Sequence, residues 1–431
     1  MIFNPVILSV TVMMALCLLK LNVIIAILIS ALIAGVSAGM GLGETMNILI
    51  NGMGGNSETA LSYVLLGTLA VAINNSGLAK IIALKISKIV KNKKFLLIFI
   101  LAIIACSSQN LIPVHIAFIP ILVPPLLSLM NKLKIDRRAV ACALTFGLKT
   151  PYIILPVGFG LIFQTIVKDQ LNANNVTITL NEVSSVNWFL GVGMLLGLLT
   201  AVFVSYRKPR EYKMTENENK SEDSNKFEKK HLFALIGAII AFGVQLNTGS
   251  LPLGALFALI FMAITNVIPW KHIDETLDGG LHLMGFIAFV MLVAAGYGNV
   301  IRETGAVPEL VAGVISIIGT NKILGAFVML CVGLFVTLGI GTSFGTIPIL
   351  AVIYCPLALS LGFSPAGIAI LVAAAGALGD AGSPASDSTL GPTAGLNADG
   401  QHQHIWDTCV PTFLHFNIPL IIFGLVGSLI F

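Results

Sequence analysis

Long apolar runs separated by short polar connections dominate this chain. A helix needs about 20 mainly apolar residues to cross the hydrocarbon core of a bilayer. Runs that approach this length occupy 4–19, 22–40, 58–78, 139–167 and 188–205 in the first half, and 231–247, 251–269, 284–300, 366–400 and 411–431 in the second half. The pattern predicts an all-α polytopic membrane protein with five spans in each half.

Two further apolar segments are pairs of arms around a polar tip. The first covers 95–130 around the residues CSSQN, and the second covers 322–361 and is broken at GTSFGT. The first arm of 95–130 is short for a span of the bilayer. We therefore predict one re-entrant hairpin in each half of the chain.

A hydrophilic segment over 206–230 divides the chain. Its richness in Lys, Glu, Asn and Ser is typical of a disordered tether. It separates 1–205 from 231–431, and each of these halves carries five predicted spans and one hairpin. Because five is an odd number, the second half enters the membrane from the opposite side. We predict two inverted-topology repeats joined by a cytoplasmic linker.

Short sequence matches support this repeat. The residues SQNLIP at 108–113 correspond to SFGTIP at 343–348, and LKTP at 148–151 corresponds to AGSP at 381–384. Inverted repeats with interrupted helices at corresponding positions are typical of secondary transporters. The matches therefore favour a carrier over other classes of membrane protein.

Composition and charge narrow the classes further. Hydrophobic residues make up 56% and charged residues 10% of the chain, whereas a soluble domain carries about 25% charged residues. A net charge of +4 without an aromatic-basic stripe argues against a nucleic-acid partner, and the six cysteines lack metal-ligand spacing. With the linker in the cytoplasm, 20 of the 24 Lys and Arg residues lie in inside loops. The positive-inside rule then places both termini outside the cytoplasm.

Four interruptions of the apolar pattern occupy corresponding positions in the two halves. They are Cys106–Asn110, Gly147–Pro151, Gly341–Thr346 and Gly379–Pro392. Irregular backbone at membrane depth is tolerated only where it is buried in protein or lines a wet cavity. We therefore predict broken helices at the bilayer midplane, within about 139–167 and 366–400, that converge with the hairpin tips on one polar site.

The residues at these interruptions suit the binding of an ion or a small polar substrate. Hydroxyl, amide and carboxylate oxygens bind hard cations, and an ionisable side chain inside a membrane is by default a functional hypothesis. The predicted sodium site is Ser108, Asn110, Ser343, Asp380 and Asp387. The full set of candidates is Ser107, Ser108, Gln109, Asn110, Lys149, Thr150, Thr342, Ser343, Thr346, Asp380, Ser383, Ser386, Asp387, Ser388 and Thr389.

Structural roles for the same residues stay open as alternatives. Either aspartate can cap the resumed helix, and Lys149 can extend its side chain to the membrane surface. The hydroxyls of 107–108 and 342–343 can hydrogen-bond back within their own helices.

The segment ALGDAGSPASDSTLGPTAGLNADGQHQHIWDTCVPTFLHFNIP at 377–419 resembles the C-terminal signature of the bacterial sodium/proton antiporter family of the NhaC type. The resemblance implies an ion-coupled carrier of the bacterial inner membrane, often a homodimer, in which one domain moves against a scaffold. Similar sequences are described both as sodium/proton antiporters and as amino-acid carriers, with histidine among the substrates.

We expect a secondary active transporter that works by alternating access, with sodium or protons as coupling ions and no cofactor. Sodium/proton antiport is the first hypothesis, and sodium- or proton-coupled uptake of histidine or a similar zwitterion is the alternative. A channel and an intramembrane enzyme are remote alternatives. The residues GTSFG match the nucleophile motif G-x-S-x-G, but apolar helical arms flank them instead of a strand-to-helix turn.

Overall fold

The computed structural model describes most of the chain as helix. The described residues are 4–19, 21–78, 81, 85, 90, 93–110, 119–213, 228–306, 309–310, 312–313, 316, 319–340, 343–384 and 386–431. Across these ranges no residue forms a strand, which confirms the predicted all-α class. Part of each predicted hairpin tip, including Thr342, and most of the predicted linker lie outside the described residues.

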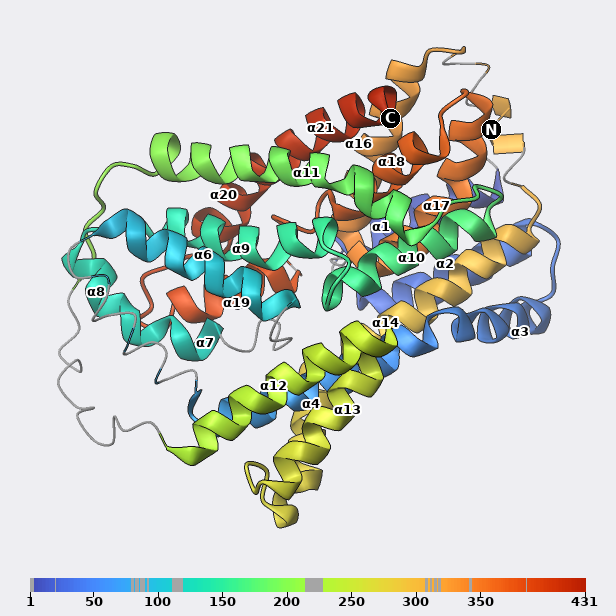
Figure 1. Ribbon diagram of the computed structural model, residues 1–431. Coiled ribbons are helices and arrows are strands. Elements are labelled where there is room, and N and C mark those ends of the chain that lie inside the picture. Colours follow the sequence, from blue (N-terminus) through green and yellow to red (C-terminus); the bar gives the residue numbers. More distant parts are fainter. Residues whose placement is uncertain are drawn as a thin grey trace.

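The first half of the chain forms a series of helices of unequal length (Figure 1). Their bounds are α1 Pro5–Leu18, α2 Val23–Ser37, α3 Leu42–Met53, α4 Ser57–Asn75, α6 Lys94–Asn110, α7 Ile119–Leu122, α8 Leu127–Lys132, α9 Arg137–Ile154, α10 Phe159–Ala173 and α11 Leu180–Thr200.

The second half continues in the same all-helical manner. Its helices are α12 Lys229–Thr248, α13 Leu251–Ile264, α14 Ile273–Glu303, α16 Lys322–Ile340, α17 Ser343–Ser360, α18 Pro365–Ala377, α19 Asp387–Leu396, α20 Val410–Thr412 and α21 Ile418–Ile430. Two π-helical segments, His404–Cys409 and Phe413–Asn417, join α20 and α21 into one long helical stretch.

Several of these helices are long and apolar enough to cross a membrane. In the described part of the chain, 5 helices meet this criterion, or 6 when α9 and α10, bent by 48° at their junction, count as one span. The five are Leu180–Ser205, Lys229–Thr248, Met284–Glu303, Ser343–Ser360 and His404–Ile430. Other predicted spans form shorter apolar helices, such as α13 with 14 residues.

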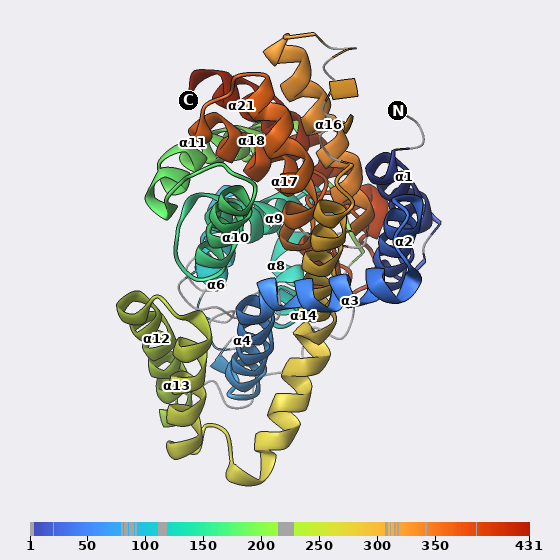
Figure 2. The same ribbon diagram turned by 90° about the vertical axis from the view of Figure 1, so that its right-hand side faces the viewer.

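The helices pack into two groups, and each half of the chain contributes to both. Helices α2, α3, α4, α12, α13 and α14 contact one another and form the α4–α14 group, which includes the lower part of Figure 2. Helices α6, α9, α10, α11 and α16 to α21 form the α9–α18 group. The contact of α14 with α17 connects the two groups, and α1 contacts α2 of one group and α16 of the other. This intermixing of the two halves is compatible with a repeat, and its inverted relationship stays a prediction.

Local sequence signals set the helix ends near the middle of the α9–α18 group. The side chain of Asp136 caps α9, and α9 continues through Pro151 to Ile154. The next helix, α10, begins after Gly158, whose φ of +60° lies in the left-handed region that glycine tolerates. The chain therefore bends at 155–158.

The predicted interruption at Gly147–Pro151 is wrong in position. Gly147 lies inside α9, where a Cβ would come within 2.3 Å of the Ala105 Cβ on α6. This glycine serves close helix packing, so the helix breaks only after it.

The second broken helix has a break at 378–386, which overlaps the predicted interruption Gly379–Pro392 from its first residue onward. Helix α18 ends at Ala377, and the backbone then turns through Gly379 at φ +82° and Gly382 at φ +109°. The side chain of Ser386 accepts a hydrogen bond from the Ser388 N–H and starts α19. Pro392, which the sequence placed in the interruption, lies inside α19.

Candidate functional site

A buried ion pair joins the two halves of the chain at the second break. Lys149 on α9 contacts Asp380, which lies between α18 and α19. The two side chains are only 4% and 3% exposed. Removing two charges from water costs several kcal/mol per ion unless their pairing and hydrogen bonds compensate. The surroundings of Asp380 must therefore supply that compensation.

Hydroxyl and amide donors from two helix starts surround the Asp380 carboxylate. The Ser343 hydroxyl donates to Oδ2 at 2.6 Å, and the Ser343 N–H donates to the same atom at 3.3 Å. The Ser386 hydroxyl donates to Oδ1. Ser343 begins α17 and Ser386 caps α19, so the positive ends of two helix dipoles also face this carboxylate.

Tyr152, which was not among the predicted site residues, completes the centre of the site. Its hydroxyl lies 3.0 Å from Lys149 Nζ and 2.8 Å from the Ser343 Oγ. Its ring packs against Phe163 and Phe344, with centroid distances of 4.9 and 5.4 Å. The one signal for it in the sequence is its place one helical turn after Lys149.

Side chains from other elements pair three backbone groups of the 378–386 break. Asn417 accepts from the Gly379 N–H at 2.9 Å and donates to the Ala381 carbonyl at 2.7 Å. The Thr389 hydroxyl donates to the Ser383 carbonyl at 2.5 Å. Since unpaired backbone groups at membrane depth are costly, these contacts stabilise the irregular backbone.

Asp387, the second predicted carboxylate, begins α19 at the edge of this site. It is half-buried and close enough to Lys149, Tyr152 and Tyr63 to interact with them electrostatically. Tyr63, on α4, is buried and was not predicted. Its ring contacts Phe159 at the start of α10 and Phe344 at the start of α17.

The remaining candidates divide into those near the ion pair and those bonded elsewhere. Thr150 is buried, and its hydroxyl has no hydrogen-bond partner among the described residues. The hydroxyl of Ser388 donates to the Asp380 carbonyl at 3.2 Å. Thr346 is buried on α17, and Ser383 donates to the Leu338 carbonyl at 3.1 Å.

The hydroxyls of the first hairpin follow the structural alternative instead. Ser107 donates to the Ile103 carbonyl at 2.9 Å, and Ser108 donates to the Ala105 carbonyl at 2.8 Å, both within α6. Gln109 and Asn110 form the last turn of α6, and their side chains lie outside the described part. The described residues therefore do not bring all five residues of the predicted sodium site together, and this site stays a prediction.

A second charged cluster lies at the start of α9. Arg137, whose side chain is fully buried, forms a two-pronged ion pair with Asp399 at 2.7 and 2.5 Å and donates to the Asn131 side chain at 2.9 Å. Burial alone would raise the pKa of the Asp399 carboxyl, but its hydrogen bonds and charge interaction with Arg137 outweigh this and hold that pKa below its usual value. Arg210 reaches the same region through Asp407 at 2.7 Å.

Family comparisons match most of the chain. The model of the family described as the Na⁺/H⁺ antiporter family matches residues 143–427, and that of the Na⁺-H⁺ antiporter family matches residues 4–90. A membrane protein of Vibrio parahaemolyticus, VP2115, is 51% identical over 439 aligned residues, which cover 99% of this chain and 100% of the relative. The proposed amino acid transporter YuiF of Bacillus subtilis is 46% identical over 442 residues, with 99% and 100% covered.

Two solved transporter structures share the fold. The YdaH transporter of Alcanivorax borkumensis has a TM-score of 0.59 and 14% identity, covering 90% of this chain and 88% of that one. MtrF of Neisseria gonorrhoeae, from a class of antimetabolite efflux pumps, has a TM-score of 0.57 and 13% identity, covering 90% and 84%. At such low identity the likeness concerns the arrangement of helices alone.

Proposed function

This chain belongs to the Na⁺/H⁺ antiporter family and is a membrane transporter, and from that premise we propose that it is a secondary active carrier that exchanges sodium for protons. The family membership confirms the resemblance found in residues 377–419. The observation that carries the proposed exchange is the buried pair of Lys149 and Asp380 at the break between α18 and α19.

The pair provides one carboxylate for which two cations compete. In the present arrangement the Lys149 ammonium occupies the position beside Asp380, and Ser343 and Tyr152 surround it. A sodium ion that takes this position binds the Asp380 carboxylate together with neighbouring hydroxyl oxygens, which are the ligands that hard cations prefer. The ammonium then loses its counter-charge in a buried environment.

An uncompensated buried ammonium costs several kcal/mol, and releasing its proton removes that cost. Sodium binding and proton loss are therefore coupled at this site. Asp387, which interacts electrostatically with Lys149, is the second carboxylate that can attract the incoming cation. Alternation of access then requires the α9–α18 group, which carries the pair, to move against the α4–α14 group.

An amino-acid carrier is the second candidate, favoured by the name of the Bacillus subtilis relative. A zwitterion carries one carboxylate and one ammonium, which match Lys149 and Asp380 in charge. In that case sodium or protons drive uptake, and the hydroxyl of Thr150, which has no hydrogen-bond partner in the described part of the chain, is available to the substrate. We further propose residence in the bacterial inner membrane as a homodimer.

Proteoliposomes that hold the purified protein and an internal pH-sensitive dye separate these candidates. A pulse of external sodium alone should change the internal pH in the wild type, and Asp380→Asn should abolish the signal. Asp169→Asn is the matched control, because Asp169 is exposed and pairs with Lys168 at the surface. No proton movement with sodium, followed by sodium- or proton-dependent uptake of radiolabelled histidine, would replace antiport by amino-acid transport.

A further inference from the structure

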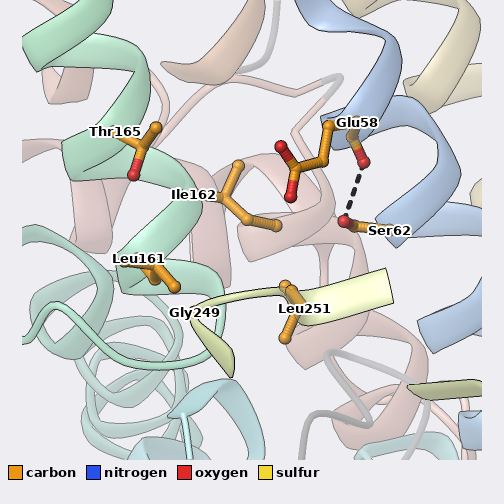
Figure 3. Close-up of a pocket in the computed structure, with 7 residues that line it drawn as sticks. All are labelled: Glu58, Ser62, Leu161, Ile162, Thr165, Gly249 and Leu251. Atoms are coloured by element: carbon orange, nitrogen blue, oxygen red, sulfur yellow. Dashed lines mark hydrogen bonds between the residues drawn. The ribbon is translucent and has the colours of Figure 1, made fainter. Parts of the chain in front are cut away.

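A small pocket of mixed polar and apolar lining lies between α4, α10 and the turn that joins α12 to α13 (Figure 3). Its volume is about 100 Å³, which leaves room for a few water molecules at roughly 30 Å³ each. Glu58, Ser62 and Thr165 supply oxygen atoms to its lining. The Glu58 side chain extends from α4 toward Ile162 of α10 (Figure 3). None of these residues belongs to the site around Lys149.

One aromatic contact is made by the same two helices that line the pocket. On α4, Ser62 is followed directly by Tyr63, and on α10 Phe159 precedes the pocket residues. The rings of Tyr63 and Phe159 meet edge to face at 5.3 Å. Glu58 and Tyr63 are five positions apart, which corresponds to about 7.5 Å along a helix. The same pair of helices therefore builds the pocket and, about one turn and a half away, the aromatic contact.

Beyond that contact lie the site residues themselves. Tyr63 also meets Phe344 at 5.7 Å, and Phe344 packs on Tyr152, which bonds Lys149 and Ser343. Tyr63 is 1% exposed and Phe159 is 0% exposed, so both rings are buried where the two helix groups meet. Tyr63 comes from the α4–α14 group, whereas its two ring partners come from the α9–α18 group, so relative motion of the groups changes this contact.

We propose that the Glu58 pocket is an antechamber that binds a small monovalent cation before it passes Tyr63 to reach the Lys149–Asp380 pair. This inference rests on the proposed function, because it takes the Lys149–Asp380 pair to be the site at which the cation finally binds. The chemistry is carried by one carboxylate and two hydroxyls in a space that holds a cation with a few waters. Such a carboxylate raises the local cation concentration through its field.

Thiol chemistry on the purified protein in detergent tests the pocket without any transport. Thr165→Cys places a thiol in the lining, and its reaction rates with a trimethylammonium and a sulfonate methanethiosulfonate reagent are compared after subtraction of the wild-type background. Glu58 is exposed, and one carboxylate at close range changes energies by about this order even in water. We therefore expect the positive reagent to react about fivefold faster. Glu58→Gln should bring the ratio close to one. Glu303→Gln, which removes an exposed carboxylate outside the pocket, should leave it unchanged.

Ion competition then distinguishes binding from screening. Sodium chloride should slow the reaction at Thr165→Cys more than choline chloride at equal ionic strength. Equal slowing by both salts, or a ratio that Glu58→Gln does not change, would overturn the antechamber. If Thr165→Cys does not fold, Leu161→Cys probes the same pocket from a half-exposed position.

Transport kinetics provide a second test of the antechamber. In proteoliposomes Glu58→Gln should raise the KM for sodium roughly three- to tenfold and change the maximal rate less than twofold, while Glu303→Gln changes neither. A wild type that moves no protons with sodium would refute the proposed exchange. The thiol reaction rates test only the cation site in the pocket and do not depend on that exchange.

Discussion

At the scale of single residues, the Lys149–Asp380 pair places two charges in the interior of the protein. Both charges are buried, so each depends on the other. Asp380→Asn should lower the free energy of unfolding by about 3–5 kcal/mol, because it leaves an ammonium buried without a counter-charge. Denaturant unfolding in detergent at neutral pH measures this loss.

The double variant Lys149→Met with Asp380→Asn should recover most of that loss, because neither charge then remains buried. Asp169→Asn is the matched control, since it breaks an exposed pair with Lys168 and should cost less than about 1 kcal/mol. Losses that simply add in the double variant would show that the two side chains do not depend on each other.

Tyr152→Phe isolates one hydroxyl at the centre of the site. The substitution keeps the ring contacts with Phe163 and Phe344 and removes the oxygen that contacts Lys149 and Ser343. We expect a loss of about 1.5–3 kcal/mol, the range for hydrogen bonds that involve a charged group, and a transport rate lowered at least tenfold. Unfolding and dye assays on the same preparation check both. An unchanged rate would exclude the Tyr152 hydroxyl from the site.

The residue types in the sequence were sufficient to predict the charged residues of the site, but not its aromatic and amide residues. Lys149 and Asp380 could be identified because a charged side chain within an apolar segment is costly and indicates a functional role. Tyr152, Tyr63 and Asn417 do not, since such residues occur in apolar helices for packing alone. Their roles depend on helices that are distant in the sequence, and only the fold brings these together.

At the scale of elements, the break between α18 and α19 depends on glycine at positions 379 and 382. A Cβ at Gly382 would lie 2.5 Å from the Phe413 Cβ, and the φ of +109° disfavours any side chain. Gly382→Ala should therefore add overpacking, about 1–3 kcal/mol, to backbone strain of about 1–2 kcal/mol. Gly400→Ala is the control, because Gly400 has a φ of +75° and nothing within 4 Å of an added Cβ.

Unfolding in detergent should show Gly382→Ala to be clearly less stable than Gly400→Ala. Similar losses for both would mean that the packing of Phe413 against the break yields easily. The transport rate of Gly382→Ala should fall as well, since Asp380 lies two residues from the strained position.

The sequence located the broken helices but not the residue at which each one breaks. Glycine and proline mark interruptions in an apolar run, yet Gly147 packs against α6 and Pro151 is accommodated within α9. The actual bend follows at 155–158, where Gly158 adopts a positive φ. Whether a glycine serves packing or a turn depends on its neighbour in space, which no single run of sequence reveals.

At the scale of the whole molecule, the pair of Arg137 and Asp399 ties the start of α9 to the loop after α19. The pKa of Asp399 is lowered in the folded state, so the pair stabilises the fold above the unfolded pKa of about 3.8. That contribution is lost as the pH falls through the lowered folded value. Asp399→Asn should cost about 3–5 kcal/mol at neutral pH because Arg137 is buried, and the difference from wild type should shrink below about pH 4. Urea unfolding at several pH values measures it, and a difference independent of pH would contradict the assignment to this carboxyl.

The orientation of the whole chain in the membrane is predicted from its basic residues and can be tested directly. Of the 24 Lys and Arg residues, 20 fall in the loops predicted to be cytoplasmic, including those of 206–230, and such a bias sets the topology of a multispanning protein. Trypsin should therefore cut 206–230 in inside-out vesicles and leave it intact in right-side-out vesicles. A protease site inserted at Gly249, in the turn between α12 and α13, is the matched control, because that turn should be cut only in right-side-out vesicles. Because Gly249 lines the Glu58 pocket, this result would also place the antechamber at the outer face. Cleavage of both positions from the same side would refute a single crossing of the membrane by α12.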